Sequence, residues 1–169
     1  SDKKGRKPGK YKWHELQDTS AYYRFFEKEK IIYSEIVQSP RFYLDSKGYF
    51  PEATSFILVG SDLKYLLGIF NSKIFNYIFK KFYSGGGLGK KGYRYKKIYF
   101  EATPIPNPDK VYKDKIISLV SKIIEIFNKE KNPNDINLTK INKIENEIEK
   151  IVGKIYNLSK HEYNEILLK

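Results

Sequence analysis

The stretch from Lys80 to Lys97 is the part of the chain whose residue types most clearly suggest a chemical role. It contains no acidic residue, and its basic residues are Lys80, Lys81, Lys90, Lys91, Arg94, Lys96 and Lys97. Ammonium groups neutralise phosphates and release counterions, and the hydroxyls of interleaved tyrosines can add phosphate contacts that fix orientation. The pattern predicts a surface that binds nucleic acid, although a solvated strand face beside a loop would have the same composition.

The four arginines of the chain are the residues best suited to reading bases. A guanidinium can donate to guanine O6 and N7 together, which makes arginine the commonest base-reading side chain. Arg41 and Arg94 flank predicted strands or loops, and we expect these two to contact bases. The full set of expected DNA-contacting residues is Arg41, Tyr43, Lys47, Lys81, Lys90, Lys91, Tyr93, Arg94, Lys96 and Lys97.

A glycine motif inside this stretch has the letters of a dinucleotide-binding fingerprint in the wrong context. Gly87, Gly89 and Gly92 have the required spacing. The fingerprint must follow a strand and open a helix, because the helix N-terminus holds the pyrophosphate. Here the glycines follow a predicted helix and precede a predicted strand, and Gly89-Lys90 lacks the Ser or Thr of a phosphate loop.

The residue sets that metal-dependent or methyl-transfer chemistry requires are not apparent. A metal-dependent nuclease needs clustered carboxylates with a lysine, yet no acid-x-lysine triplet follows the one Pro-Asp pair, Pro108-Asp109. His14 and His161 lack metal-ligand spacing, and the chain has no cysteine. The Asn-Pro-Pro-aromatic sequence of adenine methyltransferases is missing too. We therefore expect no catalytic residue, no cofactor site and no metal site in this chain.

The elements expected to position these residues are a small sheet and a helix packed on it. Runs of β-branched and aromatic residues predict strands at 30–36, 41–44, 55–59 and 93–100. Residues 45–48 predict a turn. Apolar residues at helical spacing predict one helix from its cap, Ser61, to about Phe82.

The last third of the chain predicts an antiparallel helical hairpin and a short final helix. Asp109 is expected to cap the first helix, whose apolar face is made of Ile116, Val120, Ile123 and Phe127. The second helix carries apolar residues at alternating steps of three and four, the spacing of a coiled-coil seam: Ile141, Ile144, Ile148, Ile151, Ile155 and Leu158. Ser159 and Glu162 predict a capping box for the final helix.

The predicted fold class is α+β, a small mixed or antiparallel sheet with a packed long helix, followed by the helical hairpin. The expected divisions are a flexible basic lead-in at 1–11, a DNA target-recognition domain at 12–108, and a spacer or docking hairpin at 109–169. Nearly all the excess charge lies in the first 108 residues, which hold 20 Lys and Arg against 10 Asp and Glu, whereas 109–169 hold 12 against 10. No apolar run is long enough for a membrane span, so we expect a cytoplasmic protein.

Several ordered segments resemble a known family. They include Lys30-Ile31-Ile32-Tyr33, Pro40-Arg41-Phe42-Tyr43-Leu44-Asp45 and Gly92-Tyr93-Arg94-Tyr95, with further pieces at 13–17, 48–50, 62–67, 71–73 and 104–106. Their order and gaps resemble the TaqI-like C-terminal specificity domain. That domain is found in adenine-specific DNA methyltransferases and in fused type IIG restriction–modification enzymes. The resemblance covers residues 12 to 108, and the helical tail is similar to the usual C-terminus of such enzymes.

The resemblance implies a division of labour. A separate methyltransferase domain or subunit would bind S-adenosylmethionine and methylate adenine, and a nuclease domain, where fused, would use Mg²⁺. The specificity domain would grip double-stranded DNA while the target base is flipped. The family's base-reading residues vary, so the resemblance implies this role without a residue set.

Three other interpretations stay open. The chain could be half of a type I restriction specificity subunit, although such subunits carry two recognition units and only one is present. It could be an RNA-binding or single-strand-binding module in which the tyrosines from Tyr93 to Tyr99 stack on bases. It could be an unrelated enzyme whose catalysis depends on Lys, Tyr and Glu residues.

Overall fold

The centre of the protein is a three-stranded antiparallel sheet. The computed structural model describes residues 12, 22–84, 92–130 and 132–168. In the sheet, β1 (Lys30–Ser34) lies between β3 (Phe42–Asp45) and β4 (Ser55–Leu58). A second, two-stranded pair joins β2 (Ile36–Val37) to β5 (Tyr93–Arg94), and the short 3-10 helix η1 (Tyr23–Phe25) precedes β1.

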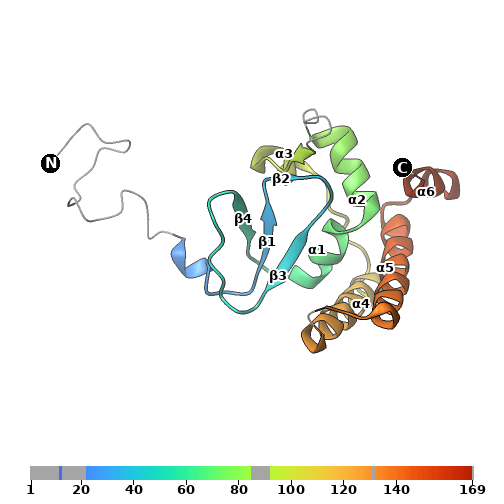
Figure 1. Cartoon of the computed structure of the whole chain (residues 1–169). Helices are drawn as coiled ribbons and strands as arrows, with labels where there is room; N and C mark the ends of the chain where they lie inside the picture. The colour runs from blue at the N-terminus through green and yellow to red at the C-terminus, as the bar shows by residue number, and fades with distance from the viewer. Residues whose placement is uncertain (1–11, 13–21, 85–91, 131, 169) are drawn as a thin grey trace.

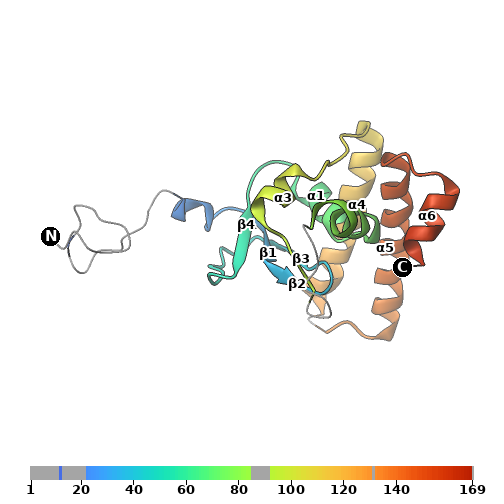
Figure 2. The ribbon, with the colours of Figure 1, turned by 90° about the horizontal axis from the view of Figure 1, so that it is seen from above.

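The helices lie on one side of this sheet (Figure 1). Their bounds are α1 (Leu63–Phe70), α2 (Lys73–Ile78), the π-helical turn η2 (Phe79–Tyr83), α3 (Lys97–Ala102), α4 (Lys110–Lys129), α5 (Asp135–Ile155) and α6 (Lys160–Leu167). In both ribbon views, α1 and α2 lie between the sheet and the helices α5 and α6 (Figure 2), and α4 packs against α1 and α5. The structure confirms the predicted α+β class.

The single helix predicted from Ser61 to about Phe82 is wrong, because the helix stops at Asn71 and restarts at Lys73. The Ser72 hydroxyl accepts the N–H of Phe75 and caps the second helix. Ser61 is not the cap of the first; that position is Asp62, at φ 60° and without a side-chain cap bond. The Asp62 carboxylate instead pairs with Lys113 of α4 at 2.7 Å.

The strand predicted at 93–100 is also wrong beyond its first two residues. β5 ends at Arg94, because its partner β2 is only two residues long. The chain then turns into α3, where the N–H groups of Tyr99 and Phe100 donate to the carbonyl of Lys96. This turn places the Phe100 ring in the core.

The core is unusually rich in aromatic rings. Phe42, Phe70, Phe79, Tyr95 and Phe100 contact one another with ring centroids between 4.6 and 6.3 Å apart. Tilted and edge-on pairs at these distances contribute beyond the area they bury. These rings therefore hold β3, α1, η2, α3 and the residue after β5 together as one unit.

The C-terminal helices pack on α1 and α2 and share that core. Gly68 of α1 makes this possible, since a Cβ there would lie 2.6 Å from Ile116 Cγ2 and 3.1 Å from Val120 Cγ2. The predicted capping box of Ser159 and Glu162 is present. The seam residues Ile141, Ile148 and Ile151 are buried, but Phe127, predicted on the apolar face of α4, is 46% exposed in its last turn. The division at residue 108 stays a prediction.

Candidate nucleic-acid interface

Arg41 lies on the surface immediately before β3, where a side chain that does not belong to the sheet bonds the backbone of the next residue. The neighbouring residue Phe42 donates its N–H to Oδ1 of Asn71 and accepts a hydrogen bond from Nδ2 of the same amide, each at 3.0 Å. Asn71 stands between α1 and α2. The exposed guanidinium of Arg41 therefore extends from a backbone that is fixed relative to α2.

Arg94 is exposed on β5, opposite Ile36 of β2. The pairing is tight, because Gly92 has φ 106° and a Cβ there would lie 2.2 Å from the carbonyl oxygen of Val37. Only glycine fits this approach. Strand β5 is thus fixed to the segment that leads from β2 toward Arg41.

Tyr93 was expected to contact phosphate, but its side chain is in the core and only 2% exposed. Its hydroxyl donates to Oδ1 of Asn76 at 2.6 Å and lies 3.1 Å from the Tyr95 hydroxyl. Burial raises the pKa of both tyrosines, so both hydroxyls remain protonated near neutral pH. Tyr93 is therefore buried and unable to contact DNA as expected, and its side chain joins β5 to α2.

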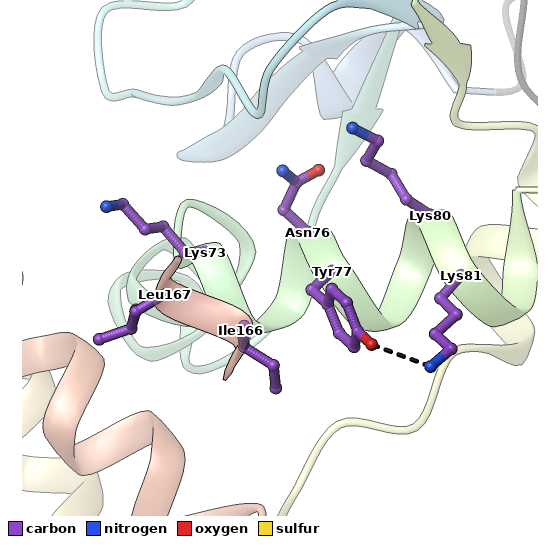
Figure 3. A pocket seen from close by; sticks show the side chains of 7 residues that line it. All are labelled: Lys73, Asn76, Tyr77, Lys80, Lys81, Ile166 and Leu167. Carbon is purple, nitrogen blue, oxygen red and sulfur yellow. Dashed lines mark hydrogen bonds between the residues drawn. The ribbon is translucent and has the colours of Figure 1, made fainter. Parts of the chain in front are cut away.

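Lys73 and Asn76 join Lys80 of the basic stretch in a polar strip on this helix, and sequence reasoning missed this arrangement. Their spacing of three and four residues places them on one side of α2 and η2, and Figure 3 shows all three side chains projecting from that side. The Lys80 ammonium lies 5.4 Å from the centroid of the Tyr93 ring. The spacing was present in the sequence, but the apolar residues between them defined the helix only as a core element.

Lys81, an expected contact, projects from another side of the same turn (Figure 3). Its ammonium donates to the Tyr77 hydroxyl at 2.9 Å, and this bond is the main cause that raises the pKa of Lys81. Glu165 of α6 adds to that shift. A hollow between α2, η2 and α6 is lined by Lys73, Asn76, Tyr77, Lys80, Lys81, Ile166 and Leu167.

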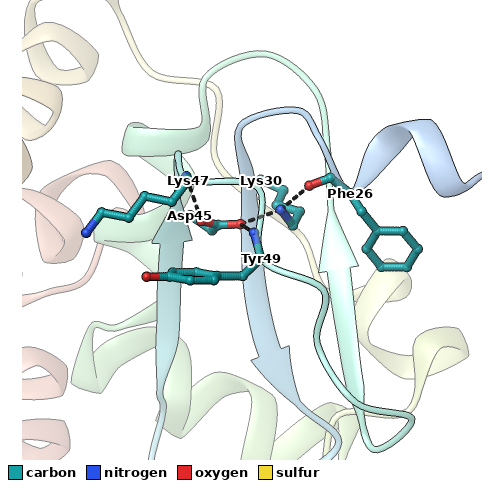
Figure 4. A network of polar contacts seen from close by, with 5 residues as sticks. All are labelled: Phe26, Lys30, Asp45, Lys47 and Tyr49. Carbon is teal, nitrogen blue, oxygen red and sulfur yellow. Dashed lines mark hydrogen bonds and ion pairs between the residues drawn. The ribbon is translucent and has the colours of Figure 1, made fainter.

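Tyr43 is exposed on β3, two residues after Arg41, and Lys47 is exposed beyond the other end of that strand. Lys47 lies in the predicted turn after β3, which a buried ion pair secures (Figure 4). The Asp45 carboxylate accepts the N–H groups of Lys47 and Tyr49, each at 2.8 Å, and pairs with the buried Lys30 ammonium. Lys30 also donates to the carbonyl of Phe26, so the turn and the segment before β1 are held together.

The remaining expected lysines lie around β5 and α3. Lys96 and Lys97 are exposed at the beginning of α3. The Lys96 ammonium is 5.7 Å from the Tyr99 ring centroid, and Lys97 lies 3.7 Å from Glu101 in an exposed pair that contributes little. Lys90 and Lys91 lie outside the described residues.

The structure thus brings Arg41, Arg94 and the α2 strip onto connected backbone. Asn71 holds the residue beside Arg41, and Asn76 holds the residue beside Arg94. Tyr43 lies on the strand that Arg41 precedes, and Lys47 lies in the turn that follows this strand. Within the described ranges, no group of three His, Cys, Asp or Glu residues could hold a metal ion. Nor does any helix in those ranges have the length and apolarity to cross a membrane.

Comparison with protein families identifies the family to which most of this region is similar. The family model of the TaqI-like C-terminal specificity domain matches residues 7–105. The matched range contains the strands β1 to β5 and the helices from η1 to α3, with Arg41, Arg94 and the polar strip, and it ends before α4.

Proposed function

This chain belongs to the family of the TaqI-like C-terminal specificity domain, and from that premise we propose that it binds a specific sequence of duplex DNA. A specificity domain is the DNA-recognition part of a restriction–modification enzyme and is not its catalytic part. In our proposal Arg41 and Arg94 read bases, while Lys47, Lys81, Lys90, Lys91, Lys96 and Lys97 contact phosphates, and Tyr43 is a further DNA contact.

The observation that carries the proposal is the attachment of both arginine-bearing segments to one helical segment, through Asn71 at the end of α1 and Asn76 in α2. Discrimination between bases requires donors held in fixed geometry, because a bidentate contact to guanine is worth about 1–3 kcal/mol only when both bonds form together. Asn71 and Asn76 hold the residues next to Arg41 and Arg94 by hydrogen bonds of 3.0 and 2.6 Å. Two guanidinium groups on one rigid frame suit sequence readout better than diffuse attraction.

The charge distribution supports duplex binding by the same surface. The exposed lysines Lys80, Lys96 and Lys97 flank Arg94 in the sequence, and among these three, in the described part of the chain, only Lys97 forms an ion pair. Lysines of this kind attract a polyanion and give a salt-dependent affinity.

We place this domain beside a methyltransferase domain or subunit that binds S-adenosylmethionine, and beside a Mg²⁺-dependent nuclease if one is fused. In that arrangement the specificity domain holds the duplex while an adenine is flipped, since unstacking costs a few kcal/mol. A bacterial enzyme of this kind would work in the cytoplasm, where its DNA substrate is.

A titration combined with site selection tests the proposal. Random-sequence duplexes are titrated with the full chain at several salt concentrations, and a random pool is then selected for tight binders. We expect measurable duplex affinity at low salt, a preferred sequence, and weaker binding to single-stranded RNA of equal length. Affinity for single-stranded RNA that exceeds the affinity for duplex would contradict the proposal.

Two sets of variants separate the roles. Alanine at Lys90, Lys91, Lys96 and Lys97 should weaken binding to all duplexes and flatten the salt dependence. Alanine at Arg41 or Arg94 should instead reduce the preference for the selected site by about 1–3 kcal/mol. If the lysine variant binds duplex as tightly as the parent at every salt concentration, these four lysines are not part of the interface.

A further inference from the structure

The amide of Asn76 has an orientation that the buried tyrosines determine. Its Oδ1 accepts the Tyr93 hydroxyl proton at 2.6 Å, and the Tyr93 and Tyr95 hydroxyls are 3.1 Å apart. The opposite orientation would place Nδ2 against Tyr93, which would then have to donate to Tyr95. Tyr95 has no solvent exposure, so its own proton would be left without an acceptor, at the cost of an unmade buried hydrogen bond.

The hydroxyl protons therefore run in one direction, from Tyr95 to Tyr93 to Asn76. This order uses both protons and leaves both N–H donors of Asn76 outward. Among the described residues, no hydrogen-bond partner is recorded for Nδ2. The half-buried amide thus presents two oriented donors at the surface of α2.

The neighbours of this amide are donors as well. Lys73 precedes Asn76 by three residues and Lys80 follows it by four, on the same side of the helix (Figure 3). The first-turn N–H groups of Lys73 and Ile74 are already bound by the Glu149 carboxylate at 2.9 Å, so a ligand must be held by side chains. Carboxylates of α5 lie near Lys73, whereas the Lys80 ammonium lies over the Tyr93 ring.

We infer that Asn76 and Lys80, with Lys73 beside them, form a phosphodiester-binding site that clamps one backbone phosphate of the DNA duplex. A site made of N–H donors and ammonium groups matches the acceptor-only, negatively charged oxygens of a phosphate. Adenine readout needs an acceptor beside a donor, and the Asn76 carbonyl is already bonded to Tyr93. The inference rests on the proposed duplex binding and adds a site to it.

This site would position the domain relative to the bases. Tyr93 is bonded to Asn76 and lies one residue from Arg94, so a phosphate held by Asn76 and Lys80 would set the register at which Arg94 enters a groove. Phosphate contacts of this kind fix orientation without carrying sequence information.

The principal test is the Asn76→Asp variant of the full chain, titrated with random-sequence duplex. Aspartate keeps an acceptor for the Tyr93 hydroxyl and replaces the two donors by an anionic oxygen, so thermal stability should stay close to that of the parent. We expect duplex affinity to fall about tenfold or more, because a hydrogen bond to a charged group is lost. Lys80→Ala should lower the slope of log affinity against log salt concentration by about 0.9, the value for one phosphate. Lys143→Ala, which removes an exposed lysine of α5, is the matched control.

A second variant guards against a folding defect. Replacing Tyr93 and Tyr95 together by Phe removes both hydroxyls without leaving one unpaired, and it frees the Asn76 amide to rotate. We expect weaker duplex binding with an unchanged salt slope, since no charge is removed. An affinity equal to that of the parent would show that the amide orientation has no role and would overturn the inference.

The phosphate that Asn76 and Lys80 bind can be identified by replacing each phosphate of the selected duplex in turn with a neutral methylphosphonate. The substitution that weakens binding by the parent should have little further effect on Asn76→Asp, because both remove the same interaction. If Asn76→Asp changes the preferred sequence instead, the residue reads a base and the phosphate assignment is wrong. If the parent binds no duplex at all, the proposed function itself fails. If the parent binds and Asn76→Asp binds equally well, only this site fails.

Discussion

The side-chain amide of Asn71 makes the two backbone hydrogen bonds with Phe42 that a neighbouring strand would make. Its Oδ1 accepts the N–H of Phe42 and its Nδ2 donates to the carbonyl of Phe42, each over 3.0 Å. The same Nδ2 also donates to the carbonyl of Leu67 at 3.2 Å. One side chain therefore joins the edge of the sheet to the end of α1, at the point where the helix breaks.

Replacing Asn71 by alanine should destabilise the protein and loosen Arg41. The backbone N–H and carbonyl of Phe42 lose their partner, which costs about 1–3 kcal/mol for a partly buried pair. Urea unfolding measures this loss, and Asn142→Ala on the exposed side of α5 is the control. The variant should also lose preference for the selected DNA site more than it loses random-duplex affinity; the reverse order would contradict the role of Asn71 in fixing Arg41.

Acid should weaken the fold through Asp45. Burial alone would raise the pKa of this carboxyl, but hydrogen bonds from Lys30, Lys47 and Tyr49 and the charge of Lys30 outweigh it and hold the pKa below 3.8. Because the folded pKa is lowered, the stabilisation is present above pH 3.8 and is lost as the pH falls through the folded value.

The measurement is urea unfolding of the parent and of Asp45→Asn across that acid range. The variant should be less stable near neutral pH, because it leaves the Lys30 ammonium buried without a counter-charge, and its stability should fall less steeply below pH 3.8. Glu162 also has a lowered pKa, from the Ser159 hydroxyl and backbone N–H, so Glu162→Gln is the control for the shared part of the loss. Equal acid slopes for the parent and Asp45→Asn would refute the assignment.

Gly68→Ala should separate α1 from α4. A methyl group at this position meets Ile116 Cγ2 at 2.6 Å and Val120 Cγ2 at 3.1 Å, and both side chains are buried. Overpacking of this kind costs about 1–3 kcal/mol, more than the small helix-propensity gain from alanine. Gly60→Ala is an unsuitable control because of its φ of 151°, so the exposed substitution Ser118→Ala in α4 serves instead. A variant as stable as the parent would mean that α4 does not depend on this close contact.

Ile148→Lys should destabilise the protein strongly. Ile148 is 5% exposed and lies in the shared core, near Gly68. A lysine there must either bury its charge or displace α5 from α1, and loss of a buried isoleucine alone costs about 2–5 kcal/mol. Thermal unfolding compared with Asn146→Lys, on the exposed side of α5, measures the effect. Unchanged stability would show that the helical tail is not part of the core.

The sequence by itself determined the local elements and the family. The β-branched and aromatic residues of β1, β3 and β4 predicted strands, because alternate side chains of a half-buried strand must be apolar. The isoleucine spacing predicted α5, and Ser159 with Glu162 predicted the cap of α6, because both patterns act within one or two helical turns. The ordered segments from Trp13 to Pro106 predicted the family that the comparison identifies.

Only the tertiary structure decided which polar residues face solvent and where the long helix breaks. The N–H groups of Lys73 and Ile74 are bound by Glu149, which lies 76 and 75 residues further along the chain. Tyr93 is buried because Asn76, 17 residues away, accepts its hydroxyl proton. Periodicity records only whether a residue is apolar, whereas a tyrosine or a helix N-terminus is buried or exposed according to partners that other elements supply. For that reason the basic stretch from Lys80 to Lys97 could be recognised from composition. The polar strip of Lys73, Asn76 and Lys80 could be recognised only from the fold.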